Sequence, residues 1–280
     1  MKLALTRDAQ EFAARTRDLF ESRIEHNLIA TVCAGVLAGR YSQSTALFAY
    51  GTVNDETRFA ALRTPPWDML VTALPAPIED ELVARWLRED PPVAGVEGPV
   101  HAARAVASAW ARKTGGTTTC RVRELTYALE RVSDPPRPAP GSLRLVRAEE
   151  RELVLEWMKG FGRETAIVTD ERAAMIVDGR TADRGLWVWD HDGPVSMLAT
   201  APRVAGAVRI GPVYTPPEHR CRGYAGTAVA AASRMALDQG ARRCMLATDA
   251  TNPTSNKIYT EIGYRQIGEH EEYEFVGVGG

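Results

Sequence analysis

A run of prolines near the middle of the chain sets the first limit on how these 280 residues fold. The segment Ser133-Asp-Pro-Pro-Arg-Pro-Ala-Pro-Gly141 holds four prolines and ends on a glycine. Because proline lacks a backbone N–H, neither a helix nor a central strand continues through such a segment. The sequence therefore predicts a linker over 133–141 between two domains, 1–132 and 142–280, each of ordinary size.

The bulk composition excludes several classes of protein without indicating a function. Hydrophobic residues at 45% and charged residues at 25% are typical of soluble globular domains. A formal net charge of -2 gives no basic surface for nucleic acid or an anionic membrane. The four cysteines lack the spacing of a zinc site or a disulfide framework.

These observations lead to expectations about location and partners. Charges at Arg7, Asp8 and Glu11 interrupt any apolar signal segment, and no stretch is long and apolar enough for a membrane helix. We expect a cytoplasmic protein, monomer or homodimer, with neither nucleic acid nor a membrane as a partner.

Hydrophobic periodicity predicts a similar succession of elements on both sides of the linker. In the first half we expect helices at 6–20, 26–39, 79–87 and 100–113 and strands at 41–50, 57–62, 69–73 and 120–132. In the second half we expect strands at 143–146, 186–189, 195–202 and 208–214, helices at 149–164, 171–181 and 225–239, then a strand, a short helix and a closing strand. The shared order suggests an internal duplication, although no repeat of individual residues supports it.

The most informative segment is Val213-Tyr-Thr-Pro-Pro-Glu-His-Arg-Cys-Arg-Gly-Tyr-Ala-Gly226, which leaves a predicted strand and opens a predicted helix. The first amides of a helix lack partners, and the helix dipole makes that end attractive to anions. Gly223 and Gly226 have no Cβ, so the backbone there admits a close approach. From these residues alone the segment is either a phosphate site or an ordinary turn with solvated arginines.

Two motifs resemble signatures of the GCN5-related N-acetyltransferase (GNAT) family. Arg220-x-x-Gly223-x-Ala225 is similar to its pyrophosphate motif, which reads Gln or Arg, two residues, Gly, one residue, then Gly or Ala. Asn252, Tyr259 and the Gly263-Tyr264 pair follow in the order and spacing of the second signature. The resemblance implies an α/β (α+β) fold of two tandem GNAT-like domains, each a mixed, mostly antiparallel twisted sheet flanked by helices.

The resemblance also implies acetyl-CoA as the acyl-donor cosubstrate. The backbone of Val213, Tyr214 and Thr215 would pair with the pantetheine arm as an additional strand. The remaining implied cofactor contacts are the amides of Cys221, Arg222, Gly223, Tyr224, Ala225 and Gly226 on the pyrophosphate, with charge from Arg220 and Arg222, and the side chains of Asn252 and Asn256.

For two of these side chains the residues leave alternatives open. Asn252 precedes Pro253, and asparagine is a good cap for the free amides of a helix that starts with proline. Asn252 can therefore contact CoA, cap the helix, or do both. Asn256 faces either the pantetheine or solvent.

The implied chemistry is a direct attack of an amine on the thioester. The protein must supply a neutral amine, polarise the carbonyl and protonate the departing thiolate, and no metal is required. Tyr259 stands where the family has its usual acid for the thiolate and is the expected catalytic residue. Its alternative role, compatible with the first, is a half-buried tyrosine that packs its helix on the sheet.

The general base is not assigned. Family members that modify proteins often have a glutamate five residues before the asparagine, where this chain has Ala247. Asp249 lies two positions further on and therefore on the same strand face, although it also suits the start of a loop. Glu164 at a helix end and a chain of waters are the other possibilities.

Several further polar residues are expected to have no chemical role. They are the histidines His191, His219 and His270, which are expected to be exposed to solvent, the thiol of Cys221, and a glutamate run interpreted as a solvated strand face, Glu269, Glu271, Glu272 and Glu274.

The first half is similar to the companion half of bacterial tandem acetyltransferases at Asn27, Thr64-Pro65-Pro66 and Gly95-Val-Glu-Gly-Pro99. The last segment stands where a phosphate turn would be, but Glu97 would repel pyrophosphate and Pro99 removes a donor. We interpret this half as a degenerate copy that either closes one wall of the acceptor pocket or covers a sheet edge.

The sequence thus predicts an acetyl-CoA-dependent N-acetyltransferase for a primary amine of an unidentified small molecule or peptide. The alternative is an acyl-CoA-binding sensor or regulatory module without turnover, which the missing glutamate permits.

Overall fold

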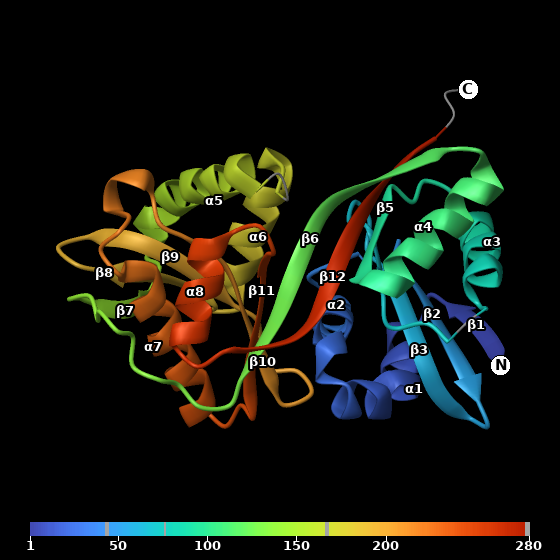
Figure 1. Cartoon of the computed structure of the whole chain (residues 1–280), viewed down its shortest axis with the longest axis horizontal. Coiled ribbons are helices and arrows are strands. Elements are labelled where there is room, and N and C mark those ends of the chain that lie inside the picture. Colours follow the sequence, from blue (N-terminus) through green and yellow to red (C-terminus); the bar gives the residue numbers. More distant parts are fainter. Residues whose placement is uncertain (43–44, 76, 166–167, 278–280) are drawn as a thin grey trace. The chain divides into compact units, whose positions relative to one another are not determined.

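The computed structural model describes residues 1–42, 45–75, 77–165 and 168–277, and the chain divides into two compact units (Figure 1). Unit 1 comprises Met1–Thr126, Asp249–Thr251 and Ile267–Gly280, and unit 2 comprises Tyr127–Thr248 and Asn252–Gln266. The division predicted from the prolines cuts the chain once, at 133–141. In the structure the last strand of each half, Thr117–Leu129 and Arg265–Val276, is instead divided between the two units. No helix or strand occurs at 130–141, the region of the expected linker.

Unit 1 begins with a strand and two helices and then alternates strands with helices. Its elements are β1 (Lys2–Thr6), α1 (Ala9–Ser22), α2 (Asn27–Leu37), β2 (Leu47–Val53), β3 (Glu56–Arg63), β4 (Met69–Val71), α3 (Glu79–Glu89), β5 (Gly95–Pro99), α4 (Val100–Thr114) and the first part of β6 (Thr117–Leu129). The strand order is β1-β2-β3-β4-β5-β12, antiparallel except for the parallel pair of β4 with β5.

The sheet of unit 1 has helices on both faces. Leu47 and Ala49 of β2 join Trp86 of α3 in one core cluster, whereas Phe48 between them meets Phe12 of α1 with ring centroids 4.8 Å apart. Successive residues of a strand point to opposite faces, so α3 lies on one side and α1 on the other.

Unit 2 repeats this order of elements. It contains β7 (Ser142–Leu145), α5 (Arg151–Thr165), α6 (Asp170–Ala182), β8 (Leu186–Asp190), β9 (Pro194–Thr200), β10 (Ala207–Tyr214), α7 (Tyr224–Asp238), β11 (Arg243–Asp249), α8 (Pro253–Glu261) and the first residues of β12 (Arg265–Val276). From β7 the strand order runs β7-β8-β9-β10-β11-β6. The matching succession of helices and strands in each half supports the predicted duplication and gives the expected mixed α/β fold.

The predicted elements are present, with three differences in the first half. The sequence did not predict β1. The strand expected at 41–50 begins at Leu47, and residues 43–44 of that range lie outside the described part. Gly95–Pro99, interpreted as the place of a turn, is strand β5.

The last strand of each half contributes to the unit built mainly from the other half. Residues 270–274 of β12 pair antiparallel with 95–99 of β5 in unit 1, while 127–129 of β6 belong to unit 2. Phe275 of β12 is buried and stacks on Trp110 of α4 with centroids 4.6 Å apart. The core of unit 1 therefore includes residues from the end of the chain.

None of the helices in the described ranges is long and apolar enough to cross a membrane.

The contribution of β12 to unit 1 is testable with one substitution. Phe275→Ala deletes a buried ring, which costs about 3 kcal/mol of unfolding free energy. We expect faster amide hydrogen exchange in α4, with α7 of unit 2 unaffected. Val276→Ala, at a side chain that is 50% exposed, is the matched control and should change stability by less than about 0.5 kcal/mol. Destabilisation confined to unit 2 would contradict the strand assignment.

Candidate functional site

The sheet of unit 2 opens between β10 and β11. Among the described residues, their parallel ladder joins only 207–209 to 243–245. Beyond Arg209, β10 continues to pair with β9 through Ile210, Val213 and Tyr214, but its partner on the other side is lost. The end of β10 thus has one backbone edge that its own sheet does not use.

An irregularity in β10 starts this divergence. The register against β9 shifts between Ile210 and Val213, and Gly211 has a φ of +140°, which a residue with a Cβ rarely adopts. A bulge of this kind bends the strand and changes the direction of the residues after it. Val213 and Tyr214, placed on the pantetheine side by the sequence resemblance, lie beyond the bulge.

The carbonyls of the last residue of β10 and of the residue after it already have partners. Ser196 Oγ donates to the Tyr214 carbonyl at 3.1 Å, and Arg220 Nε donates to the Thr215 carbonyl at 2.8 Å. Of the three residues expected to pair with pantetheine, Val213 is therefore the one whose carbonyl has no such side-chain donor in the described part of the chain.

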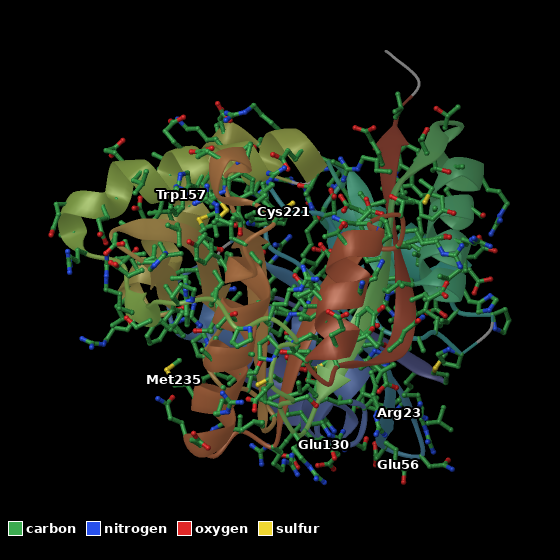
Figure 2. The ribbon with its side chains drawn as sticks, turned by 60° about the vertical axis from the view of Figure 1, so that its left-hand side comes forward. Arg23, Glu56, Glu130, Trp157, Cys221 and Met235 are labelled. Atoms are coloured by element: carbon green, nitrogen blue, oxygen red, sulfur yellow. The ribbon has the colours of Figure 1, made fainter. Side chains whose placement is uncertain are left out.

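The chain then turns tightly into α7. After the short 3-10 helix Pro217–His219, Cys221 has a φ of +61° and Gly223 a φ of +81°. Gly223 is the N-cap of α7 and provides no side-chain cap for the first-turn amides. Cys221 and Arg222 are exposed beside these amides (Cys221 is labelled in Figure 2). Uncapped amides at a helix start, next to an exposed arginine, suit an anion.

The proline segment packs against this same turn. Ala139 N donates to Thr227 Oγ1 at 2.9 Å, and a Cβ on Gly223 would lie 2.7 Å from the Arg137 carbonyl oxygen. Gly223 is thus required by its positive φ and by the neighbouring linker backbone. The linker is part of the architecture of the turn, which the sequence did not predict.

Arg220 lies in a network with α5 and β10. Its Nη2 donates to both carboxylate oxygens of Glu164, at 2.6 and 2.8 Å, and its guanidinium carbon lies 5.5 Å from the centroid of the Tyr214 ring. Tyr214 Oη donates to Glu164 at 3.2 Å. Arg220, predicted to add charge at the pyrophosphate, is paired with a carboxylate in this structure.

Tyr224 and Gly226 have packing roles inside unit 2. The Tyr224 ring is buried and its hydroxyl lies 2.8 Å from His191 Nδ1, so only its backbone faces the turn. A Cβ on Gly226 would meet Ile258 of α8 at 3.2 Å. Gly226 therefore allows the start of α7 to approach α8 closely, next to Tyr259.

Helix α8 begins as its sequence predicts. Asn252 is the N-cap, and its Oδ1 accepts from Ser255 N at 3.0 Å ahead of Pro253. Asn256 receives a hydrogen bond from Tyr127 Oη at 3.2 Å and donates to the Asn252 carbonyl at 2.9 Å. The capping role of Asn252 is present, and Asn256 uses both ends of its amide within unit 2.

Tyr259 lies in the interior of unit 2. Its side chain is 9% exposed, its ring stands edge-on to Tyr264 with centroids 6.1 Å apart, and burial raises its pKa to about 12. The phenol therefore stays protonated throughout the physiological pH range, as a donor to a developing thiolate must.

The two carboxylates considered as bases differ in their surroundings. Asp249 Oδ1 accepts from both the backbone N and the Oγ1 of Thr251 at 2.7 Å, which is the geometry of a loop start. Glu164 is instead engaged by the side chains of Arg220 and Tyr214. No group of three or more His, Cys, Asp or Glu side chains in the described ranges forms a metal site.

Two expectations of solvent exposure are wrong. His270 is 8% exposed and Glu271 is 3% exposed, and Glu271 accepts two hydrogen bonds from Arg104 at 2.6 and 2.7 Å. In the same unit Arg123 pairs with Glu269, and Arg121 pairs with Glu272. The glutamate run therefore joins β12 to neighbouring elements of unit 1, because arginines distant in sequence cover it.

The side chains of two other histidines are less open to solvent than expected. His191 is bonded to the Tyr224 hydroxyl, and His219 Nδ1 is buried without a hydrogen-bond partner among the described residues.

The equivalent position in unit 1 is closed. β4 pairs with β5 through Met69–Val96 and Leu70–Glu97, and the next residues stay in contact, since a Cβ on Gly98 would lie 2.6 Å from the Val71 carbonyl. By the order of elements that the two units share, the segment that corresponds to the turn before α7 is 72–78, between β4 and α3, and its sequence contains no glycine. The Gly95–Pro99 segment, expected to stand where the phosphate turn of a duplicated site would be, corresponds instead to strand β11 of unit 2.

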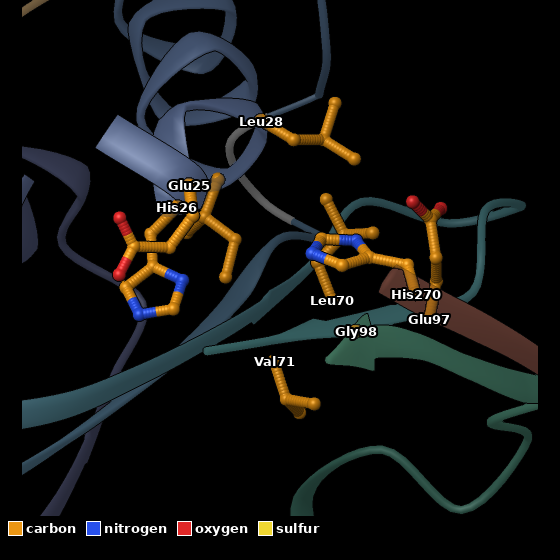
Figure 3. A pocket seen from close by; sticks show the side chains of 9 residues that line it. Glu25, His26, Leu28, Leu70, Val71, Glu97, Gly98 and His270 are labelled. Carbon is orange, nitrogen blue, oxygen red and sulfur yellow. The ribbon is translucent and has the colours of Figure 1, made fainter. Parts of the chain in front are cut away.

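A small cavity lies at this closed position (Figure 3). It has room for about one water molecule and is lined by Glu25, His26, Leu28, Ile29, Leu70, Val71, Glu97, Gly98 and His270. It is far too small for a pantetheine arm.

The split β10–β11 pair, the uncapped start of α7 and the buried tyrosine of α8 all belong to unit 2. Residues 149–264 match the family described as Acetyltransferase (GNAT) family. This part of the chain thus belongs to the GNAT family, and the family implies acyltransferase chemistry with an acyl-CoA and an acceptor as substrates.

Solved structures extend the likeness in fold to the whole chain. A tandem GNAT protein from the clavulanic acid biosynthesis pathway has 12% identity and a TM-score of 0.55, with 100% of this chain and 99% of that chain covered. A Drosophila protein has 14% identity and a TM-score of 0.67, with 98% of each chain covered. A GCN5-related N-acetyltransferase from Kribbella flavida has 21% identity and a TM-score of 0.54, with 79% of this chain and 87% of that chain covered. A comparison with curated proteins finds no match.

His26, which lines the small cavity of unit 1, leads to a prediction about how stability depends on pH. Burial lowers the pKa of His26 to about 4, partly offset by Glu25. An unfolded histidine has a pKa near 6.5, so the unfolded chain takes up this proton first as the pH falls. Stability contributed by neutral His26 is thus lost from about pH 6.5 down to about pH 4.

We expect His26→Gln to reduce the loss of unfolding free energy between pH 7 and 4.5 by about 2 kcal/mol, measured by urea denaturation at both values. His101→Gln, at an exposed histidine of the same unit, is the control and should leave the loss unchanged. An equal loss in wild type and His26→Gln would show that His26 is not buried in its neutral form.

Proposed function

We propose that this chain is an acetyl-CoA-dependent N-acetyltransferase that transfers an acetyl group to a primary amine of a small molecule or peptide, with its catalytic site in unit 2. The observation that carries the proposal is the parting of β10 from β11 beyond Arg209, immediately before the uncapped start of α7. The GNAT match over 149–264 supports the choice of acetyl-CoA as the acyl donor.

In this proposal the CoA runs along the chain from strand to helix. Pantetheine pairs with the free edge of β10, foremost with Val213, while the side-chain hydrogen bonds on the carbonyls of Tyr214 and Thr215 hold that edge in place. The pyrophosphate accepts from the amides of 221–226, and Arg222 adds a positive charge. Asn252, whose Oδ1 caps α8, contacts CoA through its side-chain NH₂ in this proposal.

The reaction is a direct transfer. The amine nitrogen attacks the thioester carbonyl carbon, the C–S bond breaks, and the proton lost by nitrogen is balanced by the proton gained by sulfur. A phenol with a pKa of about 12 is a weaker acid than a thiol with a pKa near 8.5. Complete transfer from Tyr259 to the thiolate is thus uphill by about 5 kcal/mol. We infer that Tyr259 mainly stabilises the sulfur through a hydrogen bond while its charge develops.

The base that takes the amine proton is unassigned. Ala247 has no ionisable group, and Asp249 is engaged with Thr251. The same observation favours the second candidate function, an acyl-CoA sensor without turnover.

The state of the cysteines supports the expected location. The four cysteines are free thiols in the structure, which fits a reducing cytoplasm. We propose that the protein acts there as a monomer or homodimer.

The test pairs binding with turnover. We expect wild-type protein to bind acetyl-CoA in isothermal titration and to release thiol with at least one member of a panel of amines. Tyr259→Phe should lower kcat by about 100-fold and change the dissociation constant of acetyl-CoA by less than about threefold, because the hydroxyl acts on the departing sulfur.

Tyr264→Phe is the matched control, since it removes a neighbouring buried hydroxyl that bonds Ser233 at 2.9 Å. It should retain most of the turnover. Binding without thiol release across the panel would favour the sensor, and a folded wild-type protein that binds no acetyl-CoA would contradict both functions.

A further inference from the structure

The side chain of Arg220 is paired with groups outside the phosphate turn. Its Nε and Nη2 are occupied by the Thr215 carbonyl and by Glu164, and its guanidinium lies over Tyr214. None of these partners belongs to the turn 221–226. The side chain of Arg220 is thus bound to residues of α5 and β10 and not to the turn.

The ion pair between Glu164 and Arg220 is one that a second anion could replace. The side chains of Arg220 and Glu164 are 40% and 46% exposed, and an ion pair so open to water is weak. A pyrophosphate bound at the adjacent amides is a stronger partner, since arginine bonds phosphate oxygens through charge-assisted hydrogen bonds. While Nη2 donates to both carboxylate oxygens of Glu164, its N–H groups are not directed at a second anion.

Glu164 would also keep a partner after the exchange. Tyr214 Oη donates to its Oε1 at 3.2 Å, independently of Arg220. The carboxylate is therefore held in place beside the end of β10 whichever anion Arg220 meets.

We propose that Glu164 is a positioning residue that competes with acyl-CoA for Arg220. In the free protein Glu164 neutralises Arg220; on binding, the pyrophosphate takes over the guanidinium. The competition lowers the affinity for acyl-CoA and for the CoA product, which must leave after each turnover. This inference rests on the proposed function, because it requires CoA at the turn.

The experiment is a titration of acetyl-CoA into the full chain at low ionic strength. Glu164→Gln keeps the shape of the side chain and an acceptor for Tyr214 but removes the charge, so acetyl-CoA should bind about threefold more tightly. The gain should shrink at about 0.5 M salt, where exposed charges are screened. Arg220→Gln combined with Glu164→Gln should bind no more tightly than Arg220→Gln alone.

Glu156→Gln is the matched control. It removes the same charge from an exposed position of the same helix, where Glu156 pairs with Lys159 at 2.8 Å instead. It should leave the affinity for acetyl-CoA unchanged, and equal melting temperatures of the single variants would exclude a folding effect.

Three results would overturn the inference: no gain in Glu164→Gln, an equal gain in Glu156→Gln, or a gain that persists in the Arg220→Gln background. Each of them leaves the proposed function standing, provided that wild type binds acetyl-CoA. A wild-type protein that binds no acetyl-CoA would overturn the proposed function and this inference together.

Discussion

The backbone of β10 is the constraint on which the rest of unit 2 depends. A strand inside a sheet normally satisfies its N–H and C=O groups on both edges. β10 does so with β9, but its ladder to β11 ends at Arg209 and Met245. The N–H and C=O groups of an unused strand edge can pair with another extended chain. Proteins often bind peptides and similar ligands in this way. The glycine turn and α7 come directly after this divergence in the chain, and α8 packs against the start of α7.

The two halves show how a duplicated fold loses or keeps such an edge. In unit 2 the ladder of β10 with β11 ends just before the register shift between Ile210 and Val213, and a tight turn leads to a helix without a side-chain cap. In unit 1 the corresponding strands stay together at Val71 and Gly98, and the sequence of 72–78, which leads from β4 to α3, contains no glycine. A few local residues therefore account for the difference between an open and a closed position on the same framework. Unit 1 also depends on the end of the chain, through the pairing of β12 with β5.

Much of this could be predicted from the sequence because its signals are local. The glycine turn, the Asn-Pro start of α8 and the alternation of helices with strands each depend on neighbouring residues, and the structure has them. The pairing of β12 with β5 could not be predicted, because strand partners are chosen in three dimensions. The same limit applies to Glu164 and Arg220, 56 residues apart in sequence, and to Glu271 and Arg104, 167 apart. A row of glutamates suggests a solvated face until the arginines that cover it are known.

The most direct measurement is amide hydrogen exchange, by mass spectrometry, with and without saturating acetyl-CoA. If the open edge of β10 and the start of α7 bind acyl-CoA, protection should increase at 213–215 and 221–226 and remain unchanged at 95–99 of unit 1. No added protection in unit 2, or protection centred on 95–99, would contradict the account.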